Sequence, residues 1–210
     1  MNYQENNVIN VYDQIASHFN VTRVNKWSWI TEFINTFNNI VPLIYDFGCG
    51  NGRNMNYPSI KFIGIDNSKE FIKICRNKKL HVIESNIIKT PLPSNSADAI
   101  ICIATFHHLD NSENRIDALL EMYRVLKPNG TILLSVWSIN QPPKTKRNFN
   151  QYGDNIVLWN NCGKIYERYY YIFNIDELKL LFLNANLRIN KHTYDCGNEI
   201  FYLKKQLNNL

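Results

Sequence analysis

Short apolar runs separated by turn residues recur along the chain, and segments of helical periodicity occupy several of the intervals between them. Such runs predict buried strands, over 42–47, 60–65, 81–83, 97–104 and 131–137. Helical spacing predicts helices over 68–77 and 112–126, the second ending at Pro128-Asn129-Gly130 because proline removes the next backbone donor. Strands that alternate with helices predict an α/β fold built on a mostly parallel, doubly wound sheet.

The two ends of the chain show other patterns. Helices are predicted over 8–19 and 27–37, with Asn38-Asn39 as a stop signal for the second. After Trp137 the periodicity weakens, and a polar segment carries a basic cluster formed by Lys144, Lys146 and Arg147. The remaining predicted elements are a strand over 164–173, a helix over 175–183 and a terminal hairpin of 187–194 with 199–203.

Length and composition favour one domain. A chain of 210 residues, 45% hydrophobic, can bury a single core but is too short for two domains of ordinary size. We therefore expect one domain over 1–210, with helices in 1–40 lying over the site and a mobile basic loop over 138–157. No apolar run approaches the roughly 20 residues that span a bilayer, and we expect neither a membrane segment nor a secretory signal.

Cysteine usage and net charge indicate the cellular compartment and the kind of partner that this chain has. The five cysteines are scattered and never spaced as Cys-x-x-Cys, which argues against a disulfide framework or a metal site and fits a reducing cytoplasm. The net charge of +5 favours an anionic partner without establishing one.

The strongest chemical signal is a glycine loop that follows the first predicted strand, in the segment Tyr45-Asp46-Phe47-Gly48-Cys49-Gly50-Asn51-Gly52. Glycines at alternate positions let the backbone turn sharply and approach a ligand closely. A dinucleotide site requires its third glycine one position later, where this chain has Arg53, and Asp46 would repel a pyrophosphate. A tight turn without a ligand is the alternative reading. The pattern Asp-x-Gly-x-Gly-x-Gly resembles the first motif of class I methyltransferases, which bind S-adenosylmethionine.

That resemblance implies a Rossmann-like fold with a seven-stranded sheet and an antiparallel C-terminal hairpin. In the family, the loop wraps the methionine moiety and the acid at the position of Asp46 contacts its amino group. Asp66, at the end of the next strand, can accept hydrogen bonds from both ribose hydroxyls. Where the family usually has an aspartate for the adenine amino group, this chain has Asn86, whose carbonyl can accept the same bond, and Ile87 can pack on the ring. The expected cofactor-binding residues are Asp46, Gly48, Cys49, Gly50, Gly52, Asp66, Asn67, Asn86, Ile87 and Ile103.

A closer resemblance extends over nearly the whole chain, to eukaryotic-type tRNA methyltransferases that esterify the carboxymethyl group of a wobble uridine. The matching segments are 11–19, Thr22-Arg23, Trp27, 103–108, 113–115, Val136-Trp137, 157–159, 168–171, 177–178 and 194–198. Departures are Lys26, where proline is usual, and Glu199, where tryptophan is usual. The resemblance implies that the enzyme binds the tRNA anticodon loop and works with a small zinc-binding activator, without a membrane or DNA partner.

The acceptor in that family is already a carboxylate at neutral pH, with a pKa near 4, so methyl transfer needs no general base. Arg23 and Arg115 are expected to bind the carboxylate or a neighbouring phosphate, and His107 to donate or accept a hydrogen bond at the acceptor. Trp27 or Trp137 is expected to stack on the flipped uracil.

Each assignment has a structural alternative. Trp27 fits a core position, one residue of the pair His107-His108 can be buried, and Arg115 can pair with Asp117 or Glu113 on a helix surface. The basic cluster can be a solvated loop or can contact the tRNA backbone. Two other functions stay open: methylation of a small molecule such as a quinone or sterol precursor, and a non-catalytic RNA- or partner-binding module with this fold.

Overall fold

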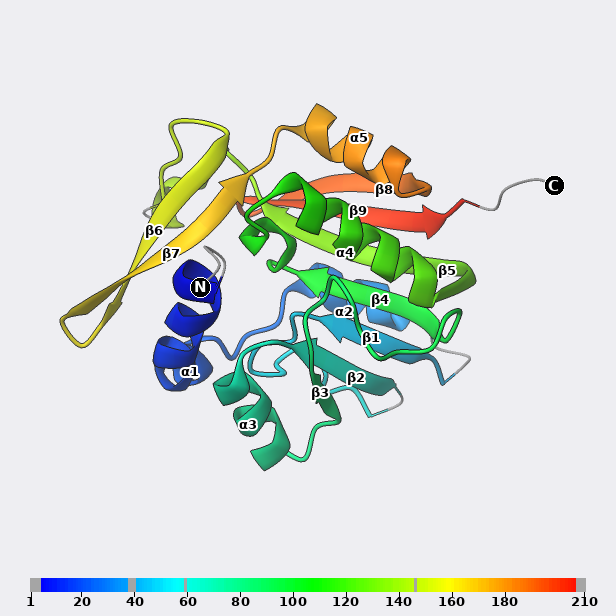
Figure 1. The fold of residues 1–210 in the computed structure, drawn as a ribbon, viewed down its shortest axis with the longest axis horizontal. Helices are drawn as coiled ribbons and strands as arrows, with labels where there is room; N and C mark the ends of the chain where they lie inside the picture. Colours follow the sequence, from blue (N-terminus) through cyan, green and yellow to red (C-terminus); the bar gives the residue numbers. More distant parts are fainter. Residues whose placement is uncertain (1–4, 38–40, 59, 146, 207–210) are drawn as a thin grey trace.

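The computed structural model describes residues 5–37, 41–58, 60–145 and 147–206. Seven strands form one sheet in the order β3-β2-β1-β4-β5-β9-β8 (Figure 1). Their bounds are β1 Leu43–Phe47, β2 Lys61–Asp66, β3 Val82–Glu84, β4 Ala97–Ile103, β5 Leu126–Trp137, β8 Leu187–Asp195 and β9 Asn198–Lys205. The first five strands pair in parallel, and β9 pairs antiparallel with both β5 and β8. The predicted α/β class and the antiparallel C-terminal hairpin are confirmed.

Helices cover both faces of this sheet (Figure 1). The α-helices are α1 Asn10–Thr22, α2 Ser28–Asn35, α3 Lys69–Asn77, α4 Ser112–Val125 and α5 Ile175–Asn184. A π-helical turn, η1 (Glu5–Ile9), leads into α1, and the 3-10 turns are η2 (Phe106–His108) and η3 (Pro143–Thr145).

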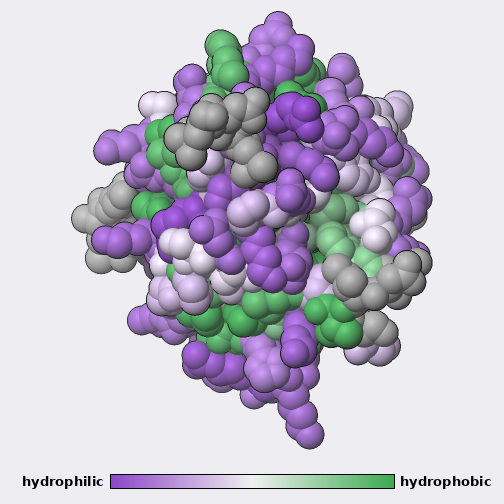
Figure 2. Space-filling view, turned by 90° about the vertical axis from the view of Figure 1, so that its right-hand side faces the viewer, coloured by the Kyte–Doolittle hydropathy of each residue, from purple (hydrophilic) through white to green (hydrophobic). Residues whose placement is uncertain are grey.

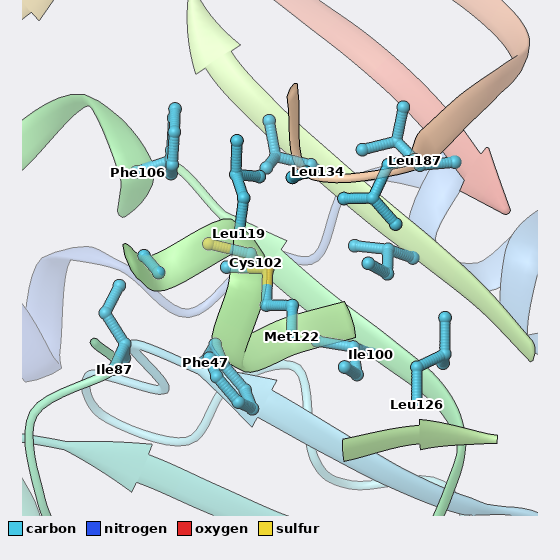
Figure 3. Close-up of a cluster of buried hydrophobic side chains, with 14 of the residues drawn as sticks. Phe47, Ile87, Ile100, Cys102, Phe106, Leu119, Met122, Leu126, Leu134 and Leu187 are labelled. Carbon is cyan, nitrogen blue, oxygen red and sulfur yellow. The ribbon is translucent and has the colours of Figure 1, made fainter. Parts of the chain in front are cut away.

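Alternation along the central strands explains the two covered faces. On β4, Ile100 and Cys102 point into a core with α4 and α5, where Leu119 and Met122 are fully buried (Figure 3). Ile101, one position along, points into the opposite core with α2. Because successive strand residues face opposite sides, a continuous apolar run is what a sheet covered on both faces requires.

Two predicted helix ends differ from the structure. Helix α2 ends at Asn35, before the predicted stop at Asn38-Asn39, which lies outside the described residues. Helix α4 ends at Val125 rather than at Pro128-Asn129-Gly130, and this tripeptide lies within β5. The physical reason is Leu126, which is fully buried and pairs with Ala97, so the chain becomes extended before it reaches the proline.

A second, two-stranded sheet lies beside α1 (Figure 1) and was not expected. Strand β6 (Gly153–Asn161) pairs antiparallel with β7 (Lys164–Ile172). The boundary predicted for a loop over 138–157 is therefore wrong, since 153–157 belongs to β6. Cys162 and Gly163 both adopt positive φ, of 52° and 90°, as a two-residue hairpin turn requires. The strand predicted over 164–173 is this β7, outside the main sheet.

Among the described residues, no helix combines the length and apolar character needed to cross a bilayer. All five cysteines are free thiols.

Candidate active site

A cavity of about 1190 Å³ opens at the carboxyl ends of the parallel strands. Its walls come from the glycine loop after β1, the end of β2, helix α1, the segment before α2, and the β6–β7 hairpin. Ligands bind at this edge in doubly wound sheets because the strand order reverses there, between β1 and β4. This volume slightly exceeds the range of roughly 300–1,000 Å³ that is typical of small-molecule and cofactor pockets.

The glycine loop takes a conformation that strongly favours glycine. Gly48, Gly50 and Gly52 have φ values of 78°, 53° and 73°. A Cβ on Gly48 would lie 2.1 Å from Cγ2 of Thr105, and one on Gly52 would lie 2.3 Å from Cδ1 of Leu80. At Gly50 the nearest side-chain atom, on Phe19, is 4.0 Å away. Gly48 and Gly50 line the cavity, whereas Gly52 does not and serves the packing of the loop.

These contacts predict different effects for two otherwise equal substitutions. Gly48→Ala should lower the free energy of unfolding by about 2–4 kcal/mol, because left-handed strain adds to a clash with a β-branched side chain. Gly50→Ala carries the strain alone and should cost about 1–2 kcal/mol. Urea unfolding of both variants measures the difference, and equal destabilisation would contradict this description of the loop.

Asp66, at the end of β2, ties the loop to the start of α3. Its carboxylate accepts hydrogen bonds from the backbone N–H groups of Gly50 (2.8 Å) and Ser68 (2.9 Å). Burial raises the pKa of Asp66 to about 6, and these backbone donors limit the rise. The residue lines the cavity, and each oxygen retains a lone pair that can accept from a ligand hydroxyl.

Asp46 lies buried next to the loop, with 1% of its surface exposed. Neither of its carboxylate oxygens has a hydrogen-bond partner in the described structure. Burial, followed by the charge of Asp66, raises its pKa to about 8, while Arg53 opposes the rise. Asp46 does not line the cavity itself. Buried acceptors without donors are rare, so this pair of oxygens fits a site that an ammonium group or an ordered water completes.

The other predicted cofactor residues form the cavity wall. Ile87 and Ile103 are each 6% exposed and offer apolar surface, and the side-chain oxygen of Asn86 accepts from the backbone N–H of Ile88 at 3.2 Å. Cys49 and Asn67 also line the cavity. Eight of the ten predicted cofactor residues are therefore brought together at one surface, with Asp46 and Gly52 behind it.

On the acceptor side, the structure brings Arg23, Trp27 and Trp137 to the cavity. The ring of Trp137 stacks on Tyr170 with centroids 4.1 Å apart and planes 7° apart. The guanidinium of Arg147, from the basic cluster, lies 4.1 Å from the ring of Trp137. Trp27 stacks less closely, on Trp29 at 6.1 Å.

His107 is placed elsewhere. It is fully buried, does not line the cavity, and accepts a hydrogen bond at Nδ1 from the backbone N–H of Trp137 (3.0 Å). Burial holds its pKa well below the ordinary value. Its neighbour His108 lines the cavity, donates from Nδ1 to the carbonyl of Tyr169 (2.8 Å), and accepts at Nε2 from Tyr12 (3.0 Å). The predicted contact of His107 with the acceptor does not follow from this geometry.

Arg115 also lies away from the cavity. It is 5% exposed, donates to the carbonyl of Leu109 (3.1 Å), and its guanidinium lies 3.4 Å from the ring centroid of Tyr171. Its acidic partner is Glu177, at 3.9 Å, and not the expected Asp117 or Glu113. Arg115 therefore joins the start of α4 to β7, and the acceptor contact predicted for it has no geometric support.

Sequence reasoning missed the residues that the hairpin contributes. Trp159, Arg168 and Tyr170 line the cavity, although the sequence identifies their segments only as landmarks of the family. The available signal was strand alternation, which places Arg168 and Tyr170 on one face of β7. In the basic cluster, Arg147 lines the cavity, Lys144 is exposed, and Lys146 lies outside the described residues.

Several known proteins are similar to this chain in sequence or in fold. A family model described as a methyltransferase domain matches residues 45–134. The tRNA (carboxymethyluridine(34)-5-O)-methyltransferase of Schizosaccharomyces pombe is 32% identical, and the alignment covers 93% of this chain and 95% of that protein. The mouse protein of the same description is 35% identical over 69% of this chain, which spans only 22% of the mouse protein's length.

Two solved structures share the fold. One is a methyltransferase in complex with the Trm112 methyltransferase activator of Haloferax volcanii, with TM-score 0.70, 14% identity, and coverage of 97% of this chain and 98% of that one. The other is the Burkholderia thailandensis 1,6-didemethyltoxoflavin-N1-methyltransferase with bound S-adenosylhomocysteine, with TM-score 0.66, 15% identity, and coverage of 99% and 92%. This chain therefore belongs to the family of the tRNA (carboxymethyluridine(34)-5-O)-methyltransferases, and it has the fold of S-adenosylmethionine-dependent methyltransferases.

Proposed function

We propose that this enzyme methylates the carboxylate of 5-carboxymethyluridine at the wobble position of tRNA and forms the methyl ester. The names of the relatives support the substrate. The observation that carries the proposal is one continuous cavity, with Asp66 and the glycine loop at one side and arginine and aromatic side chains at the other. Such a cavity suits a nucleoside cofactor facing an anionic nucleobase.

The residues present fit S-adenosylmethionine, and the two unpartnered oxygens of Asp46 are the most specific sign of this. Asp66 would accept from the ribose hydroxyls, Ile87 and Ile103 would pack on the adenine, and Gly48 and Gly50 would lie along the methionine moiety. The bound cofactor supplies an electrophilic methyl group on a sulfonium.

The acceptor requires no deprotonation, since a carboxymethyl group is ionised at neutral pH. A carboxylate oxygen of the acceptor would be the nucleophile, and the cofactor would supply both the methyl group and a neutral thioether leaving group. The task of the protein is to align these atoms and to exclude water. Trp27 and Trp137, whose backbone N–H donates to His107, would form walls around the uracil, and Arg23 and Arg147 would bind neighbouring anionic groups.

Transfer of a labelled methyl group distinguishes this function from the two alternatives. Incubation with total tRNA, a lipid extract and methyl-labelled cofactor should place label in RNA and none in lipid. Label in the lipid extract alone would support the small-molecule alternative, which the arginines lining the cavity do not favour. Cofactor binding without transfer to either pool, even with an activator present, would support a non-catalytic module.

We further propose that a small zinc-binding activator pairs with this chain, in the cytoplasm. In the Haloferax complex, a protein of the same fold binds a methyltransferase activator. Strand β3 is at the edge of the sheet, and its Val82 and Ile83 are only half-buried, so a partner strand could pair there. Hydrophobic patches on the face shown in Figure 2 offer further surface for a partner to cover.

Co-expression tests the partnership. The chain with the activator should form a soluble one-to-one complex whose methyl transfer to tRNA exceeds that of the chain alone by about tenfold or more. Size-exclusion chromatography and labelling measure the two quantities. A chain that is soluble, monomeric and fully active by itself would refute the need for an activator.

A further inference from the structure

Four arginines line the cavity. Arg53, which follows the glycine loop, is near the charge of Asp46, and the other three have no acidic partner in the described structure. Arg23, Arg147 and Arg168 come from the end of α1, the loop before β6, and β7. Among the side chains that the structure describes, those of 7–37, 41–58, 60–145 and 147–206, none of these three has a carboxylate oxygen within 4.0 Å. Burial first, and then the charge of Arg168, lowers the pKa of Arg23. Three mutually repelling cations in one cavity indicate a site for an anion.

Arg168 is the deepest of the three, with 6% of its surface exposed. Its Nη1 donates to the phenol oxygen of Tyr170 at 2.7 Å, and its buried Nε has no hydrogen-bond partner. The guanidinium lies 4.8 Å from the ring of Trp159, so its described surroundings are aromatic. A buried charge without a counter-charge is destabilising, and a bound anion would offset this cost.

The burial of each arginine side chain indicates which anionic group it can bind. Arg23 is exposed and Arg147 is half-buried, at positions where a phosphate of an RNA backbone can reach. Arg168 lies on the same strand face as Tyr170, which stacks on Trp137, the proposed support of the uracil. A carboxylate attached to that uracil would enter beside the stacked rings, where Arg168 offers a free N–H.

We propose that Arg168 binds the carboxylate of the methyl acceptor and thereby selects carboxymethyluridine over uridine, while Arg147 and Arg23 bind phosphates. The inference rests on the proposed function, and it identifies the residue that recognises the carboxymethyl group of the uridine. Each carboxylate oxygen has two lone pairs, so an oxygen bound to the guanidinium can still attack the methyl carbon.

The binding of two anticodon stem–loops tests the proposed role of Arg168. They differ only in carrying carboxymethyluridine or uridine at the wobble position, and binding is measured by fluorescence anisotropy with S-adenosylhomocysteine present. The wild type should prefer the carboxymethyl RNA, and Arg168→Gln should reduce this preference by about tenfold or more. Arg147→Gln should weaken the binding of both RNAs by the same factor. Arg188→Gln, on the exposed side of β8, is the charge-matched control and should change neither.

The outcomes separate the two claims. A folded Arg168→Gln variant, identified by unchanged affinity for S-adenosylhomocysteine, that keeps the wild-type preference would overturn the role of Arg168. If that variant does not fold, Arg168→Lys decides, because lysine keeps the charge but loses the planar fork and should lose part of the preference. A wild-type enzyme without any preference would instead count against the proposed substrate.

Discussion

Replacing Asp66 by asparagine should weaken binding of S-adenosylmethionine by a factor on the order of 10²–10⁴, the loss expected for two charge-assisted hydrogen bonds to ribose hydroxyls. The carboxylate also holds the N–H groups of Gly50 and Ser68 at 2.8 and 2.9 Å, and an asparagine side chain can accept through one oxygen only. One of these backbone groups would then face an NH₂ group, and the loop would lose its position.

The loss of binding should not come from unfolding. Burial raises the pKa of Asp66 to about 6, which shows that its charge is itself costly in the folded state, so removing the charge offsets part of the lost hydrogen bonding to the loop. Isothermal titration calorimetry gives the affinity and thermal unfolding gives the stability. Asp176→Asn, on the exposed surface of α5, is the matched control and should change neither. Unchanged affinity in the Asp66 variant would show that the ribose binds elsewhere.

Cofactor affinity should rise with pH by up to about tenfold per unit between pH 6 and 8 because binding releases a proton from Asp46. The pKa of this residue is raised to about 8 in the free protein, so its carboxyl group is largely protonated at pH 7. A cationic ligand nearby favours the ionised form, and its binding therefore displaces the proton.

The same shift predicts how stability depends on pH in the absence of cofactor. Because the folded-state pKa lies above the unfolded value, the protonated carboxyl stabilises the folded state fully at low pH. This contribution decreases as pH rises above the unfolded value and is lost as pH passes through 8. Asp46→Asn should flatten both profiles. Calorimetry in buffers of different ionisation enthalpy counts the released protons, and an equal release from the Asp46→Asn variant would contradict the assignment.

Most of the fold could be predicted from local pattern. Buried strands such as β4 are nearly uniform apolar runs bounded by turns, and only a sheet covered on both faces produces them. Strand β6 could not be recognised in this way, since its exposed positions include Ile156 and Leu158, and asparagines interrupt the run. Its stability comes from pairing with β7 and from the contacts of the buried Trp159 with α1. The contacts with α1 join residues that are far apart in the sequence, so a local pattern does not reveal them.

The cofactor side of the site was predictable because its residues lie on consecutive segments of one motif, at strand ends whose position the topology fixes. The acceptor side depends on how the hairpin packs against α1 and η2. His107 and His108 are adjacent in sequence, yet only the second faces the cavity. Arg115 and Arg168 are both buried arginines, and only the structure shows that the first has an acidic neighbour, Glu177, while the second has none among the described residues.

The central claim is that an anionic nucleobase substituent receives the methyl group. Mass spectrometry of the nucleosides of a carboxymethyluridine stem–loop, after reaction with the enzyme, S-adenosylmethionine and the activator, tests this most directly. The account predicts that the wobble nucleoside gains one methyl group, which mild alkali removes as expected for an ester, while the uridine stem–loop stays unchanged. Methylation of a ring nitrogen, a ribose hydroxyl or the unmodified uridine would contradict it.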